Sequence, residues 1–268
     1  MQTNTHVAWR RQNVRKALLI VSFLFFPVTF YYMSPYLIIM GAGERTASGS
    51  AIVFGVLLAL SLVLGRLFCS WVCPVGGLGE TLAAAQGRRA SNRANWTRWL
   101  VWVPWIAVVL LTIIRAGGYA RADFFYQTDH GVSLTTKDNV GPYFMYYTVL
   151  GVMVILSLAA GKRGFCHHAC WIAPFMMIGR GIRNVLHLPA VQLQSDSAAC
   201  SGCHACAAAC PMSLPVEEMV RQHRMENSEC ILCGSCVDTC PRRAIRYDFG
   251  RPLPREAADP ATRPPTSV

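Results

Sequence analysis

The sequence predicts an α-helical membrane protein, with four transmembrane helices in two repeated hairpins and a C-terminal α+β ferredoxin domain of the bacterial 2[4Fe-4S] type. The 268-residue chain is 53% hydrophobic and only 15% charged, and its apolar residues occur in blocks, which is typical of membrane proteins. The pattern C-x2-C-x2-C-x3-C-P occurs twice near the C-terminus. A shorter pattern, C-x3-C, occurs twice earlier in the chain.

Four apolar stretches approach the roughly 20 residues that a bilayer core requires. They are Ala17 to about Met40, Gly49 to Phe68, Trp99 to Ile114 and Tyr143 to Ala160. Prolines at positions 27, 35 and 104 lie within them and predict kinks, which membrane helices tolerate. The predicted organisation is therefore a basic arm over residues 1–16 and a transmembrane domain over residues 17–173.

Lysine and arginine residues predict the orientation of the spans. They concentrate in the N-terminal arm, in the loop after the second span and after the fourth span, while the opposite loops hold fewer basic residues, diluted by aspartates. By the positive-inside rule, this predicts a multi-pass protein of the inner (cytoplasmic) membrane, with both termini and the ferredoxin domain in the cytoplasm. The net charge of +11 then reflects proximity to membrane lipid. A nucleic-acid partner is not expected, because the basic residues form no stripe interleaved with aromatic residues.

The doubled cysteine motif predicts two [4Fe-4S] clusters. Three thiolates at every third position can wrap three corners of a cubane, and the fourth reaches the other cluster. One predicted ligand set is Cys200, Cys203, Cys206 and Cys240, and the other is Cys230, Cys233, Cys236 and Cys210. Zinc ribbons use paired C-x2-C knuckles, and disulfide frameworks suit small secreted domains, so neither alternative accounts for the pattern. Such clusters carry single electrons, so the predicted function is electron transfer.

The segments around this motif are also assigned from the sequence. Residues 174–193 predict an amphipathic linker helix, lying either at the membrane interface or against the ferredoxin domain. The ferredoxin domain is predicted over residues 194–250, with a short helix from Pro215 to Arg224 and a strand from Ala244 to Tyr247. Residues 251–268 are rich in proline, alanine and charge, which predicts a disordered tail.

The C-x3-C elements at 69–73 and 166–170 form an internal repeat, because each follows an apolar span, a glycine, a basic residue and a phenylalanine. Hairpins repeated in one orientation are related by an axis along the membrane normal, which brings both elements to the same face. The pairs Cys69/Cys73 and Cys166/Cys170 are therefore candidate redox residues. Their spacing leaves open a further metal or cluster, a dithiol–disulfide pair, a Cu(I) site, or simple packing.

His167 and His168 lie inside the second C-x3-C element. Histidine exchanges protons near neutral pH, and quinol oxidation releases protons together with electrons, so both are candidates for proton handling. The alternative is a polar contact at the membrane interface, where the amphipathic imidazole ring is favoured.

The spans, the C-x3-C elements and the two-cluster ferredoxin motif together resemble the NapH-type membrane ferredoxin proteins. The membrane parts of the NosR-type and CcoG-type proteins look similar. Cys69, Cys73 and Pro74 match the C-x3-C-P motif of that family, whereas Cys170 is followed by Trp171. The resemblance implies quinol oxidation, or related membrane electron transfer, that feeds a partner redox protein.

The resulting interpretation is a membrane-bound electron-transfer protein that connects the quinone/quinol pool to a partner redox protein through two [4Fe-4S] clusters. Its enzyme class would be that of a quinol dehydrogenase subunit, with a quinone as a further ligand. Two alternatives remain: a thiol-dependent copper reductase or maturation factor for a respiratory enzyme, and a membrane anchor or docking subunit of a larger redox complex.

Overall fold

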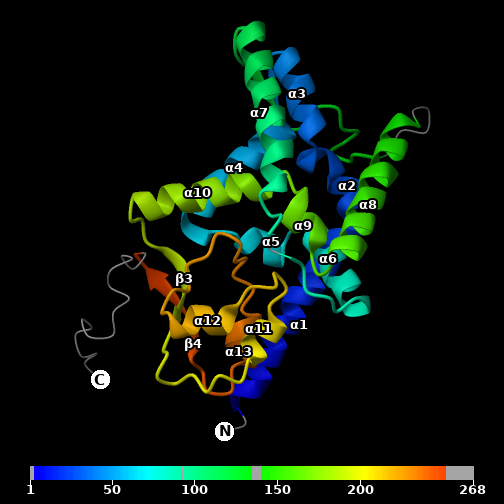
Figure 1. Ribbon diagram of the computed structural model, residues 1–268. Helices are drawn as coiled ribbons and strands as arrows, with labels where there is room; N and C mark the ends of the chain where they lie inside the picture. Colours follow the sequence, from blue (N-terminus) through cyan, green and yellow to red (C-terminus); the bar gives the residue numbers. More distant parts are fainter. Residues whose placement is uncertain (1–2, 92, 135–139, 252–268) are drawn as a thin grey trace.

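The structure is a computed structural model, which describes residues 3–91, 93–134 and 140–251. Long apolar helices project from a smaller unit that carries the ferredoxin motifs, and α1 runs alongside this unit (Figure 1). The helices are α1 Thr3–Leu24, α2 Phe26–Thr29, the 3-10 helix η1 Phe30–Met33, α3 Pro35–Gly43, α4 Gly49–Leu64, α5 Leu67–Trp71, α6 Pro74–Ala85, α7 Thr97–Ala116, α8 Gly141–Ala160, α9 Gly164–His168, α10 Ala173–Val185, α11 Ala205–Ala209, α12 Val216–Arg221 and α13 Ser235–Thr239. The strands are β1 Thr46–Ser48, β2 Arg121–Asp123, β3 Ala190–Ser195 and β4 Ile245–Gly250.

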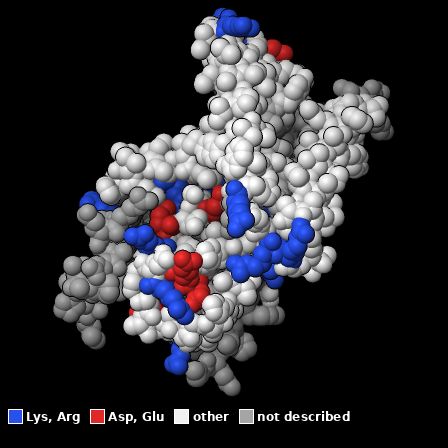
Figure 2. All heavy atoms as spheres, viewed as in Figure 1, with Lys and Arg blue, Asp and Glu red and all other residues white. Residues whose placement is uncertain are grey.

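Helices α7 and α8 are long and apolar enough to cross a membrane. Each has 20 residues, and only 6% of the apolar window of α7 and 17% of that of α8 are buried. Their exposed side chains include Leu110, Ile114, Phe144 and Ile155. Figure 2 shows charged side chains gathered around the ferredoxin part and at one tip, while the projecting helices are almost free of charge. Such extended apolar surfaces are unfavourable in water, which indicates a membrane protein.

The first predicted span, Ala17 to about Met40, is not one continuous helix. Among the described residues, a third candidate span is the bent pair Arg10–Leu24 and Phe26–Met33, with an angle of 62° at the break. Proline lacks a backbone N–H and clashes with the preceding turn, so Pro27 and Pro35 each lie at the start of a new helix. Pro104, by contrast, lies within an unbroken α7. The four-span arrangement therefore stays a prediction.

The second predicted span is shorter than the sequence indicated. Helix α4 has 16 residues and ends at Leu64, because the chain turns at Gly65, whose φ is 55°. A glycine after the last helical residue commonly ends a helix in this way. The C-x3-C elements thus begin on separate short helices, α5 and α9, beyond the ends of α4 and α8, and Cys73 and Cys170 follow the ends of these helices.

One predicted boundary is wrong, that of the linker helix. The arm predicted over residues 1–16 and the start of the first span share one helix, α1, from Thr3 to Leu24. The linker helix ends at Val185, not at residue 193, because residues 190–195 form β3. This strand pairs antiparallel with β4, from Ala190 opposite Gly250 to Ser195 opposite Ile245, so the sheet of the ferredoxin domain begins before residue 194.

Other predictions for this domain are confirmed. The expected short helix between the motifs is α12, and the expected strand after the last cysteine is β4. A disordered tail was predicted over residues 251–268, and all of these except Arg251 lie outside the residues that the structure describes. A short parallel pairing of β1 with β2 was not expected; it joins the start of α4 to the connection between α7 and α8.

Helix α10 connects the membrane part to the ferredoxin domain. Gly179 lies so close to Ser61 of α4 that a β-carbon would overlap the serine hydroxyl group. The opposite side of α10 contacts the ferredoxin domain, where Arg180 donates to the carbonyl oxygen of Cys230 at 2.8 Å. The predicted linker helix therefore packs against both parts.

Buried ion pairs hold the two parts together. Six arginines are at most 2% exposed: Arg15, Arg66, Arg98, Arg163, Arg180 and Arg183. In the membrane part, Glu80 of α6 lies 3.0 Å from Arg15 and 2.8 Å from Arg163. Burial alone would raise the pKa of Glu80, but the two arginines lower it to about 2.

The ferredoxin domain supplies the other counter-charges. Glu229 lies 3.1 Å from Arg66 and 2.9 Å from Arg98. Glu226 pairs with Arg180 at 2.5 Å and with Arg183 at 3.1 Å. Because a buried charge without a partner is strongly unfavourable, the ferredoxin domain is required to neutralise arginines that the membrane part buries.

Glu229→Gln should lower the stability of the protein by about 3–5 kcal/mol, because it leaves Arg66 and Arg98 buried without a carboxylate. Denaturant unfolding in detergent, followed by circular dichroism, measures the effect. The matched control is Glu218→Gln on the exposed side of α12, which should change stability by less than about 0.5 kcal/mol. Equal stability of the two variants would contradict the role of the ion pair.

Gly179→Ala should also destabilise the protein, by about 1–3 kcal/mol, because the added methyl group forces α10 away from α4. Gly181 lies on the same helix with no atom within 4 Å of an added β-carbon. Gly181→Ala should therefore be neutral or stabilise by up to about 1 kcal/mol. The same unfolding measurement compares the two variants. Equal stability of Gly179→Ala and Gly181→Ala would contradict the close packing of α10 against α4.

Candidate functional site

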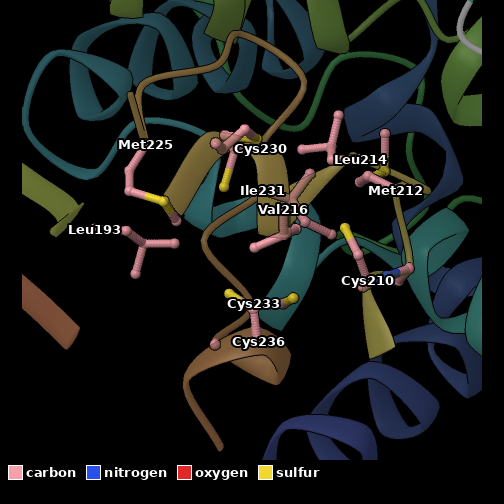
Figure 3. Close-up of a pocket in the computed structure, with 13 residues that line it drawn as sticks. Leu193, Cys210, Met212, Leu214, Val216, Met225, Cys230, Ile231, Cys233 and Cys236 are labelled. Atoms are coloured by element: carbon pink, nitrogen blue, oxygen red, sulfur yellow. The ribbon is translucent and has the colours of Figure 1, made fainter. Parts of the chain in front are cut away.

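A first cavity, of about 400 Å³, is lined by four cysteine side chains. They are Cys210, Cys230, Cys233 and Cys236. Figure 3 shows that Cys230, Cys233 and Cys236, which belong to one loop, and Cys210, which comes from another segment, surround one space. The rest of the lining is mainly apolar and includes Leu193, Met225 and Ile231, which excludes water from the thiols.

The loop that carries three of these thiols is held in place by Tyr247 of β4. The Tyr247 hydroxyl group donates to the carbonyl oxygen of Leu232 at 2.7 Å. Arg180 of α10 and Gln12 of α1 donate to the carbonyl oxygens of Cys230 and Cys233, at 2.8 Å and 3.1 Å. The loop is thus fixed both from its own domain and from the membrane part.

A second cavity, of about 330 Å³, is lined by the other four ferredoxin cysteines, Cys200, Cys203, Cys206 and Cys240. It lies nearer the surface, since Cys203 is exposed. The neighbouring His204 is 72% exposed and lies 2.9 Å from Glu217, which also pairs with Arg221. These polar groups form the rim of the second cavity.

The residues that line the cavities fit iron–sulfur clusters. Each cavity combines three cysteines of one motif with the last cysteine of the other, which is the donor set of two-cluster ferredoxins. None of the cysteines in the described residues forms a disulfide. Within the same residues, no three Cys, His, Asp or Glu side chains lie close enough to hold a single metal ion.

The structure also brings together the cysteines of both C-x3-C elements, Cys69, Cys73, Cys166 and Cys170, which we call the four-thiol site. All four are buried, with exposures between 4 and 8%. Helix α6 packs against both α5 and α9, which joins the two elements. Burial raises the pKa of the Cys73 thiol well above its ordinary value, and the proximity of the other three thiols raises it further. Burial likewise raises the pKa of Cys170 to about 12.

Buried arginines surround the four-thiol site. Arg163 donates to the carbonyl oxygen of Cys69 at 2.9 Å, and Arg66 lies within electrostatic range of Cys69 and Cys170. The basic residues of this region were expected to reflect membrane orientation alone. The roles of Glu80, Glu226 and Glu229 were not predicted, although acidic residues are scarce in the chain, with 14 against 25 basic ones.

The two candidate histidines take different positions. His167 is fully buried, and its Nδ1 lies 3.0 Å from the Asn95 side-chain oxygen. Burial lowers the pKa of His167 to about 4, so the ring stays neutral near pH 7. This argues against proton exchange at neutral pH by His167. His168 is half-buried, with its Nδ1 3.2 Å from the carbonyl oxygen of Ala94.

Comparisons with known proteins agree with these cavities. The chain matches the family described as 4Fe-4S dicluster domain over residues 199–245. It also matches the family described as 4Fe-4S binding domain over residues 47–92 and 142–188, which contain the C-x3-C elements. No solved structure matches the chain.

Among curated proteins, the chain is 26% identical to the ferredoxin-type protein NapH of Escherichia coli, over 71% of this chain and 63% of the relative. It is 23% identical to the putative electron transport protein YccM of the same organism, over 83% and 62%. It is 29% identical to the methylamine utilization ferredoxin-type protein MauN of Methylobacillus flagellatus, over 55% and 48%. The match thus spans less than two thirds of the length of each of these three relatives. The chain is therefore similar to the NapH-type ferredoxin proteins and matches two families described as 4Fe-4S domains.

Proposed function

We propose that the protein passes electrons between the quinone/quinol pool and a partner redox protein through two [4Fe-4S] clusters. One observation carries this proposal: the loop of the first cavity is hydrogen-bonded to Arg180 and Gln12 of the membrane part, whereas the second cavity includes the exposed Cys203. When bound there, clusters supply one-electron transfer. The arrangement suits a protein that connects a donor in the membrane to an acceptor in solution.

The protein's own residues hold the first cavity against the membrane part. Glu229 directly precedes Cys230 and pairs with Arg66, which lies three residues before Cys69. Arg180 fixes the carbonyl oxygen of Cys230. The apolar lining keeps water away from the thiols, and solvent exposure and hydrogen bonding are among the factors that set cluster potentials.

We further propose a multi-pass topology in the cytoplasmic membrane, with the ferredoxin domain and both termini in the cytoplasm. Helices α7 and α8 supply two spans. The bent pair of α1 with α2 and η1 forms a third, and the apolar helix α4 is the fourth. The concentration of basic residues on the side of the ferredoxin domain supports this orientation.

The alternative functions are less well supported. A copper-handling protein needs thiols that can receive a metal ion from a donor, but the four-thiol site is at most 8% exposed. A purely structural anchor does not require two cavities lined by cysteines. If substitution of a cysteine in the first cavity, such as Cys233, abolishes electron transfer to the partner protein, the result favours electron transfer over an anchoring role.

The function is tested by adding a quinol analogue to the anaerobic protein in lipid vesicles and following the visible absorbance of the clusters. We expect bleaching by the quinol and recovery on addition of an oxidised quinone. A Cys230→Ser variant, which keeps the membrane part but alters the first cavity, should respond much less. Wild-type clusters that neither accept electrons from quinols nor return them to quinones would overturn the proposal.

Exchange of the fourth ligand between the motifs is a separate prediction. Since Cys210 lines the cavity of the other motif, Cys210→Ser should give the same EPR spectrum as Cys230→Ser, with one cluster altered. It should differ from Cys200→Ser, although Cys200 and Cys210 belong to one motif. A Cys210→Ser spectrum that matches Cys200→Ser would instead show that each motif binds its own cluster.

A further inference from the structure

The protein buries more positive charge than the neighbouring carboxylates neutralise. In the residues that the structure describes, the ion pairs of the six buried arginines involve three carboxylates, each shared by two arginines: Glu80, Glu226 and Glu229. All six arginines are at most 2% exposed, so three buried positive charges are in surplus. Water screens buried charge far less than surface charge, and the surplus therefore acts on the groups beside it.

One arginine from each shared ion pair lies close to the loop of the first cavity. Arg180 donates to the carbonyl oxygen of Cys230 at 2.8 Å. Arg66 donates at 2.9 Å to the backbone carbonyl oxygen two residues before Cys230. Arg163 lies within electrostatic range of Cys233. The surplus positive charge is therefore held beside the thiols of this cavity.

The charged groups around the second cavity are exposed instead. Arg221 is 63% exposed and His204 is 72% exposed, and both pair with Glu217. Arg242, which also lines this cavity, is exposed as well. Charges at such positions are weakened by water and salt. The two cavities thus offer the same four cysteine ligands but differ in the charge that surrounds them.

Surrounding charge helps to set the reduction potential of an iron–sulfur cluster, together with hydrogen bonds and solvent exposure. Reduction adds one negative charge. Burial by itself makes that charge less favourable and lowers the potential, whereas nearby positive charges stabilise it and raise the potential. The apolar lining and the arginines of the first cavity therefore act in opposite directions. Three surplus positive charges against one added electron favour the arginines.

We propose that the buried arginines raise the reduction potential of the cluster in the first cavity, so that this cluster accepts an electron before the cluster in the second cavity. Arg66, Arg163 and Arg180 all belong to the membrane part, so the difference between the clusters depends on its contact with the ferredoxin domain. The inference rests on the proposed two-cluster function and adds the order in which the clusters are reduced.

The test is a redox titration of the full chain in detergent, followed by EPR, with chemical mediators and without quinol. The variants Cys233→Ser and Cys203→Ser identify the signals of the first and second clusters. In the wild type, the signal of the first cluster should appear at the more positive potential. Equal potentials, or the reverse order, would overturn the inference alone. Wild-type protein without two cluster signals would overturn the proposed function as well.

Opposite substitutions in one ion pair separate the effect of charge from structural disturbance. Arg180→Gln removes a positive charge and should lower the potential of the first cluster by at least about 59 mV, a tenfold change in the equilibrium constant of a one-electron couple. Glu226→Gln breaks the same ion pair but removes a negative charge, so it should raise that potential. Shifts in the same direction, or no shift in either variant, would overturn the inference.

Two further variants control this comparison. Arg180→Lys keeps the charge and should keep a potential close to that of the wild type. A shift as large as that of Arg180→Gln would show that hydrogen bonding, and not charge, sets the potential. Arg246→Gln, at an exposed position on β4 of the same domain, should leave both potentials unchanged. If the variants at Arg180 do not fold, the order of the two potentials in the wild type still decides.

Discussion

The structure depends on one constraint: arginines that the membrane part buries need carboxylates, and the ferredoxin domain supplies part of them. Arg66 and Arg98 depend on Glu229, and Arg180 depends on Glu226. Because these ion pairs are largely shielded from water, separating the domains would leave charges in an apolar environment. The two parts are therefore held in one arrangement, which a flexible tether would not achieve.

The same ion pairs determine where the redox groups lie. Glu229 is the residue before Cys230, so its pairing with Arg66 places the loop of the first cavity next to the four-thiol site. The second cavity lies on the exposed part of the domain, where Cys203 reaches the surface. The cysteines are consequently arranged in three groups, from the ends of the apolar helices to solvent. The two ferredoxin groups lie close together, which suits the proposed electron transfer between their clusters.

Patterns with fixed spacing were predictable from the sequence. The cysteine repeats located both the ferredoxin domain and the C-x3-C elements, and the hydropathy located α7 and α8. The bends at Pro27 and Pro35 were expected as kinks, but their effect on the first span depends on packing with other helices. The ion pairs could not be predicted, because Arg66 and Glu229 are far apart in the sequence and only the fold brings them together. A basic residue beside an apolar segment fits both membrane orientation and a buried ion pair, and composition does not separate them.

The order of the two ferredoxin centres is the central claim, and EPR with a water-soluble paramagnetic relaxing agent tests it most directly. Such an agent acts mainly on centres near the surface. The account predicts strong relaxation of the cluster that is lost in Cys203→Ser and weak relaxation of the cluster that is lost in Cys233→Ser. Equal relaxation of both clusters, or stronger relaxation of the one held by Cys233, would contradict it.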